Sequence, residues 1–107
     1  MSEFKYNESE KTLTCVISGR LDTIASIPVQ NELNTELQKY RQPGEALLPI
    51  RIIFDFSQAN FISSTFIRIC LSTAKQVVPG SFSIIHCDPF LKKTFKIAGL
   101  DEILNVT

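Results

Sequence analysis

Apolar and polar residues alternate along two segments near the start of the chain, residues 3–7 and residues 12–17. A two-residue period predicts β-strands with one buried face. The polar residues 8–11 separate the two segments, and Gly19 follows the second. We therefore expect an N-terminal antiparallel hairpin whose second strand ends at Gly19.

Three later segments carry apolar residues every three or four positions, which is the spacing of one helix face. Each follows a Ser, Thr or Asp residue that can cap a helix, and each stops at Pro or Gly. Pro28 fits the first segment if Ser26 is its cap, because an amide lost in the first turn has no partner within the helix. We predict helices between Ser26 and Pro43, between residues 63–65 and Pro79, and between Asp88 and Gly99, with a last helical turn at residues 100–104.

Two further apolar segments lie between these helices, at residues 50–56 and 81–87. Residues 50–56 are nearly all apolar, which is typical of a strand covered on both faces, and a polar turn is expected at residues 57–60. Strands that alternate with helices predict right-handed crossovers within one sheet. We expect a single α/β domain over residues 1–107, with a central mixed sheet of four to five strands and about four helices packed on it.

The composition is that of an ordinary globular chain, with 44% hydrophobic residues, 21% charged residues and a formal net charge of zero. A zero net charge provides no field that attracts nucleic acid, and we interpret Lys92, Lys93 and Lys96 as a solvated helix face. No apolar run is long enough to span a bilayer, and the N-terminus lacks the features of a signal peptide. We expect a cytoplasmic protein that does not insert into membranes.

The reactive side chains form no arrangement typical of an enzyme. His86 is the only histidine and follows an apolar strand, so we interpret it as structural, and Cys87 beside it should point to the opposite face. Cys15, Cys70 and Cys87 are expected to be buried, reduced thiols. No metal-binding motif or glycine-rich phosphate loop is present in the sequence. The sequence predicts a protein that is not an enzyme and needs neither metal nor cofactor.

Polar residues gather after the apolar segment at residues 50–56. Asp55 lies near its end, and polar side chains follow at positions 57, 58 and 60. Residues 63–65, Ser-Ser-Thr, then open a helix, where the amides and the helix dipole favour an anion. A phosphate on one of these hydroxyls would fit electrostatically. The residues alone favour the simpler interpretation, in which one hydroxyl caps the helix and the others are solvated.

Four segments resemble STAS domains, which occur in bacterial anti-sigma-factor antagonists and as tails of sulphate transporters. The ending Gly-x-Leu-Asp of the second strand is found at Gly19–Asp22, and the next helix starts near Pro28. Residues 52–57 and 61–65 resemble the central strand and switch loop of the family, and residues 98–104 resemble its Gly-Leu ending. Together the four segments cover almost the whole chain.

The resemblance implies a switch motif, Asp-Ser-x-Gly, in which a Ser or Thr is phosphorylated by a partner kinase that is also the anti-sigma factor. Here the motif reads Ser63-Ser64-Thr65-Phe66. The phosphorylation candidates are therefore Ser64 first and Thr65 second. Ser63 replaces the motif's Asp, so the carboxylate that could orient the hydroxyl is missing, and Asp22 of the neighbouring loop is the candidate to contribute charge instead. Phe66 replaces its Gly and is expected either in the core or, if exposed, on a partner surface.

The predicted function is that of an anti-sigma-factor antagonist that binds an anti-sigma factor, a serine kinase or a phosphatase and is switched by phosphorylation. The alternative is a non-phosphorylated STAS adaptor in a larger complex, such as a lipid-transport ATPase. A nucleotide-binding domain is a third hypothesis, although it lacks a phosphate loop. The oligomeric state stays open. The expected partner surface consists of Asp22, Thr23, Ser57, Asn60, Ser63 and Phe66.

Overall fold

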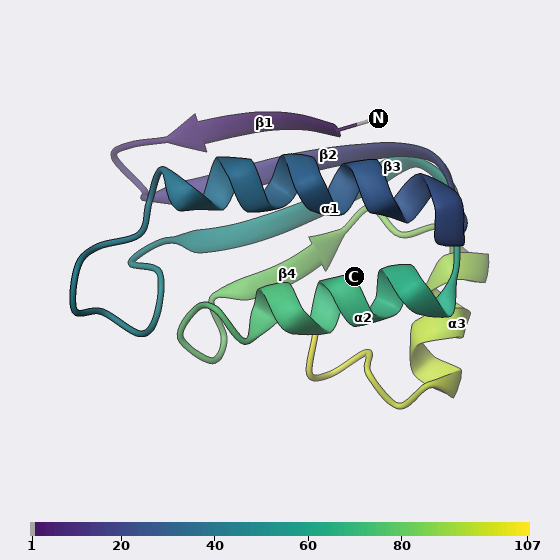
Figure 1. The fold of residues 1–107 in the computed structure, drawn as a ribbon. Helices are drawn as coiled ribbons and strands as arrows, with labels where there is room; N and C mark the ends of the chain where they lie inside the picture. Colours follow the sequence, from purple (N-terminus) through teal and green to yellow (C-terminus); the bar gives the residue numbers. More distant parts are fainter. Residues whose placement is uncertain (1) are drawn as a thin grey trace.

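The computed structural model describes residues 2–107, which form four strands and three helices in the order expected for an α/β domain (Figure 1). The elements are β1 (Ser2–Asn7), β2 (Thr12–Leu21), α1 (Thr23–Gln38), β3 (Arg51–Ile62), α2 (Ser64–Ala74), β4 (Phe82–Ile85) and α3 (Pro89–Ile97).

The four strands form one mixed sheet in the order β1-β2-β3-β4. β1 and β2 pair antiparallel, which confirms the predicted hairpin, whereas β2, β3 and β4 are parallel. The C-terminal segment lies beside the edge strand β4, where Val106 forms a parallel bridge with Ile84. The sheet edge at β4 is therefore partly covered by the chain's own end.

The prediction of about four helices was too high, because residues 2–107 contain three. Gly99 ends α3 with a φ of +74°, and the amides of Gly99 and Leu100 donate to carbonyls of the last helical turn. Residues after Gly99 form turns rather than a fourth helix. Asn105 then donates from its side chain to the Phe82 carbonyl at 2.8 Å, which fixes the segment against β4.

The predicted start of α1 was also wrong, since Asp22 and not Ser26 caps this helix. Ser26 lies inside the first turns, fully buried, and its hydroxyl donates to the Asp22 carbonyl at 2.7 Å. Pro28 is therefore a residue within the helix rather than part of its first turn. The cap lies earlier than expected because β2 continues past Gly19 to Leu21 and leads directly into α1.

Residues 57–60 are part of β3 rather than the predicted turn. The pairing of β2 and β3 has two irregularities, between Val16 and Ser18 and between Gly19 and Arg20, where β3 contains extra residues. Such bulges interrupt the alternation of buried and exposed side chains without ending the strand. The polar sequence of this segment therefore resembles a turn although its backbone stays extended.

The helices cover one face of the sheet, and Figure 1 shows α1 and α2 side by side on it. On β3, Ile52, Phe54 and Phe56 are buried against them, whereas Ile53 and Asp55 on the opposite face are partly exposed. The expectation that this strand is covered on both faces was therefore wrong. Most of the apolar residues of this segment thus belong to the core on one face, and Ile53 is the apolar residue on the other.

Aromatic rings form the centre of the core. Phe66 of α2 is 0% exposed, and its ring centroid lies 5.9 Å from that of Phe56 and 6.4 Å from that of Phe54. Phe95 of α3 stacks on Phe56 with a centroid distance of 6.3 Å. The Phe56 ring of β3 therefore contacts both α2 and α3. This packing fixes the position of α2 on the sheet, and with it the position of the residues at its N-terminus.

The cysteines are free thiols, and Cys15 and Cys70 are fully buried as predicted, whereas Cys87 is only partly buried. Burial raises the pKa of both thiols above the ordinary range, and it raises the pKa of the half-buried Cys87 to about 11. All three are therefore protonated near neutral pH, so these side chains behave as small hydrophobic groups.

Candidate functional site

The N-termini of α1 and α2 lie next to each other at one edge of the sheet. Leu21 at the end of β2 pairs with Ile62 at the end of β3, and each strand leads within two residues into its helix. The Ser63 amide donates to the Leu21 carbonyl at 2.9 Å, which continues the contact past the last strand residue. Parallel pairing therefore places two helix N-termini, with their unpaired amides, at one site.

Each helix begins with a side-chain cap. The Asp22 carboxylate accepts a hydrogen bond from the Ala25 amide at 2.8 Å. The Ser63 hydroxyl accepts one from the Phe66 amide at 3.3 Å. Both caps have extended backbone conformations, as the position requires. Ser63 therefore serves as the N-cap of α2.

The hydroxyl groups that follow Ser63 have different surroundings. Ser64 is exposed, and its hydroxyl makes no hydrogen bond within residues 2–107. Thr65 is partly buried, and its Oγ1 lies 3.4 Å from the Oγ1 of Thr23 on α1. Thr23 and Thr65 thus connect the two helices, whereas the Ser64 hydroxyl is exposed and makes no such contact.

The other predicted surface residues lie apart from this group. Asn60 is exposed on β3 three residues before Ser63, opposite the second irregularity in the strand pairing. Ser57 is exposed six residues before Ser63, and at about 3.3 Å per residue of extended chain it lies beyond contact with Ser64. Phe66 is in the core, so its side chain is not part of any surface.

Three residues at the site were not predicted from the sequence. Ile24 and Ile27 on the first turns of α1 are 80% and 56% exposed, which is unusual for such large apolar side chains. Arg68 is exposed on α2, one helical turn after Ser64, and makes no ion pair within the described chain. The spacing of Ser64 and Arg68, four residues apart, is the sequence signal that indicates this neighbour.

A second polar group lies further back on β3. Asp55 Oδ1 accepts from the Ser57 amide at 2.9 Å and lies 3.1 Å from His86 Nδ1. Partial burial by itself raises the pKa of Asp55, but the hydrogen bonds from Ser57 and His86 lower it below its usual value overall. His86 follows β4 in a left-handed conformation, with a φ of 58°. The pair therefore links the end of β4 to β3, in agreement with a structural role for His86.

Two negative findings apply to residues 2–107. No three His, Cys, Asp or Glu side chains come together in a way that suits a metal ion. No helix in this part of the chain is both long enough and apolar enough to cross a membrane.

Comparison with known proteins identifies the family. Residues 3–107 match the model of the STAS domain. The chain therefore belongs to the STAS domain family, as the resemblance of its segments predicted. No curated protein sequence matches it.

Solved structures of similar fold include two anti-sigma factor antagonists. One, from Mycobacterium paratuberculosis, superposes with a TM-score of 0.79 at 14% sequence identity, covering 99% of this chain and 83% of that one. The other is the anti-sigma factor antagonist SpoIIAA in its unphosphorylated form, with a TM-score of 0.73 at 17% identity, covering 100% of this chain and 88% of that one. At these identities the likeness confirms the fold.

The different surroundings of Ser63 and Ser64 lead to a stability prediction. Ser63→Ala removes the cap of α2 and should lower the free energy of unfolding by about 1 kcal/mol. Ser64→Ala removes no contact and should change that free energy by less than about 0.5 kcal/mol. Urea denaturation of both variants measures the difference. Equal destabilisation by the two substitutions would contradict the assignment of Ser63 as the cap.

The lowered pKa of Asp55 leads to a pH prediction. Its folded-state pKa lies below the unfolded value of about 4, so its carboxylate stabilises the fold above that pH, and this contribution is lost as the pH falls through the lowered pKa. Asp55→Asn should lower the free energy of unfolding by roughly 1 kcal/mol at pH 7, and the difference from wild type should narrow below pH 4. Glu45→Gln, an exposed control, should show no such trend. A difference that is constant from pH 7 to pH 3 would disprove the role of Asp55.

Proposed function

We propose that this STAS domain is a regulatory module that binds a protein partner through the paired N-termini of α1 and α2, and that phosphorylation of Ser64 switches this binding. The partner class is an anti-sigma factor that is also a serine kinase. The observation that carries the proposal is the Ser64 hydroxyl, which is exposed and makes no hydrogen bond within the described chain, whereas the hydroxyls of its neighbours Ser63 and Thr65 both have partners.

Access distinguishes Ser64 from the other hydroxyl groups. A kinase must bring the hydroxyl within bonding distance of a γ-phosphate, which requires a side chain that can leave its place without breaking the fold. The Ser63 hydroxyl accepts from the Phe66 amide, and the Thr65 hydroxyl lies against Thr23. Ser64 alone of the three has no such contact, so it is the first acceptor and Thr65 the second.

A phosphate on Ser64 has favourable groups around it. It would lie at the first turn of α2, where amides are unpaired and the helix dipole is positive. Arg68 lies one turn further along the same helix face and has no competing carboxylate within the described chain. The phosphorylated domain should therefore keep its fold while the charge of its surface changes.

The neighbouring surface of α1 supports a protein as the partner. Ile24 and Ile27 are exposed beside Asp22 and Thr23, and large apolar side chains that face solvent beside polar groups are typical of protein interfaces. A partner that binds at the paired starts of α1 and α2 would contact both these isoleucines and Ser64. A phosphate buried in such an interface would lose its hydration and add charge and bulk to a surface that fits a neutral hydroxyl, so phosphorylation should release the partner.

The similar solved structures agree with this class of function, since both are described as anti-sigma factor antagonists and one as the unphosphorylated form. The proposal assigns no catalytic step to this chain. It places the module in the cytoplasm, where a kinase has access to ATP.

A second candidate function is that of a non-phosphorylated adaptor in a larger complex, such as a transport ATPase. The observation in its favour is that Ser63 and Phe66, which replace the Asp and Gly of the switch motif, are committed to the cap and to the core. In that case the partner binds to the surface around Ile24 and Ile27, and binding does not depend on phosphorylation.

Phosphorylation with the cognate serine kinase and ATP, followed by peptide mass spectrometry, tests the switch. We expect one phosphate on Ser64, lost in Ser64→Ala and retained in Ser9→Ala, which alters another exposed serine. In a binding assay, Ser64→Ala should bind the partner as wild type does, whereas Ser64→Asp should bind about tenfold more weakly or worse.

The two candidate functions give different results. If the kinase modifies a known substrate but leaves residues 63–65 unmodified, the switch is disproved. Stable binding of a transport ATPase that depends on Ile24 then supports the adaptor. If Ile24→Asp binds every partner as well as wild type does, the surface itself is assigned wrongly.

A further inference from the structure

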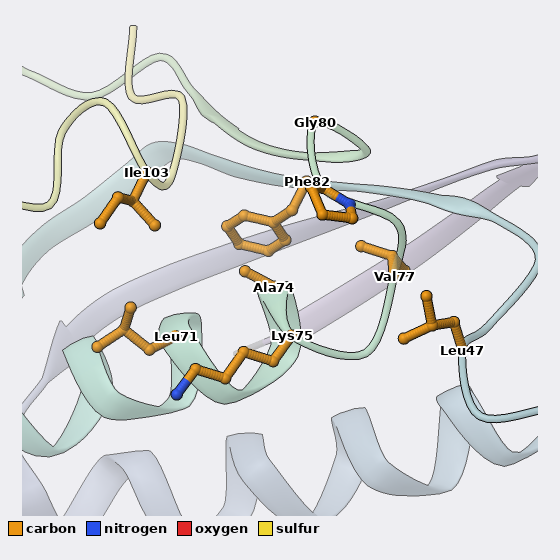
Figure 2. Close-up of a pocket in the computed structure, with 9 residues that line it drawn as sticks. Leu47, Leu71, Ala74, Lys75, Val77, Gly80, Phe82 and Ile103 are labelled. Carbon is orange, nitrogen blue, oxygen red and sulfur yellow. The ribbon is translucent and has the colours of Figure 1, made fainter.

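An apolar pocket lies at the carboxyl end of α2, at the opposite end of this helix from Ser64. Its volume is about 530 Å³, within the range of roughly 300–1,000 Å³ that is common for small-molecule sites. Three distant parts of the chain form it: the loop before β3, the end of α2 with the following loop, and the C-terminal turn (Figure 2). The lining residues are Leu47, Leu71, Ala74, Lys75, Val77, Pro79, Gly80, Phe82 and Ile103.

One cation faces this otherwise apolar lining. Lys75 is the only lining residue with a charged side chain. It is exposed and makes no ion pair within residues 2–107. Figure 2 shows its side chain extending from the end of α2 back beside Leu71, so the ammonium group lies along the helix rather than at its carbonyl end. An anion at this position therefore avoids the negative end of the helix dipole.

The apolar side chains at the pocket rim are unusually exposed. Leu47 and Ile103, which both line the pocket, are 39% and 65% exposed. Single exposed apolar residues are common on protein surfaces, but a group of them around a concave site is typical of a ligand-binding groove.

We propose that this pocket binds a small amphipathic carboxylate, whose hydrocarbon chain lies between Leu71, Phe82 and Ile103 and whose carboxylate pairs with Lys75. The apolar lining selects the chain, and the single unpaired ammonium selects one negative charge. This inference is independent of the role of Ser64, because the two sites share only α2.

Titration with octanoate, followed by two-dimensional NMR at pH 7.5, tests the proposal with a probe well below its micelle concentration. We expect saturable shifts at Leu71, Val77 and Ile103, and weaker binding of the uncharged 1-octanol. Lys75→Gln should weaken octanoate binding about tenfold or more, while binding of 1-octanol changes little. Ala74→Phe fills the pocket and should abolish binding of both compounds.

Lys92→Gln is the matched control, since Lys92 lines a second hollow on α3 with Lys93, Lys96 and Ile97. This variant should bind octanoate as wild type does. Two results would overturn the proposal: shifts that do not saturate, and saturable binding that is unaffected by Lys75→Gln or Ala74→Phe. Loss of binding in Lys92→Gln would place the site on α3 instead. The spectrum of each variant also shows whether it is folded, so a folding failure is not mistaken for loss of the site.

Discussion

The parallel pairing of β2 with β3, continued to Leu21 and Ile62, is the interaction on which the rest of the arrangement depends. It ends both strands at one level, and the hydrogen bond from the Ser63 amide to the Leu21 carbonyl extends it into the start of α2. Without this register, Asp22 and Ser63 would cap two helices at unrelated places. With it, two sets of unpaired amides and the Ser64 hydroxyl share one surface.

Packing beneath the sheet edge keeps this surface in place. Phe66 lies three residues after Ser63, and its ring packs against the rings of both Phe54 and Phe56. Phe66 therefore anchors the first turn of α2 in the core, while Ser64, in the same turn, stays exposed. Phe66, which stands where the family's switch motif has Gly, thus contributes to the core and leaves the Ser64 hydroxyl accessible.

Much of this fold could be predicted from local pattern. Alternation identified the hairpin, apolar spacing identified the three helices, and the run Ser63–Thr65 located the start of α2. The cap of α1 could not be assigned, because it depends on where β2 stops pairing, and pairing is a tertiary property. The continuation of β3 through residues 57–60 could not be predicted either, because the bulges there depend on pairing with β2 and interrupt the alternation of buried and exposed residues. The pocket at Lys75 combines three distant segments, so no local pattern could reveal it.

Helix α2 thus presents different chemistry at its two ends. Its N-terminus carries hydroxyl groups and unpaired amides beside exposed isoleucines of α1, and its C-terminus borders an apolar pocket with one lysine. Its N-terminal end is held on the sheet by Phe66, whose ring packs against those of Phe54 and Phe56, and its C-terminal end meets Phe82 of β4 at the pocket.

Amide hydrogen exchange at residues 63–65 tests most directly whether the strand pairing builds the site. The Ser63 amide, bonded to the Leu21 carbonyl, should exchange as slowly as the amides of β3, whereas the amides of Ser64 and Thr65, in the first turn of α2, should exchange rapidly. Exchange at Ser63 as fast as at Ser64 would contradict the account, because the two helix N-termini would then not be held together by the sheet.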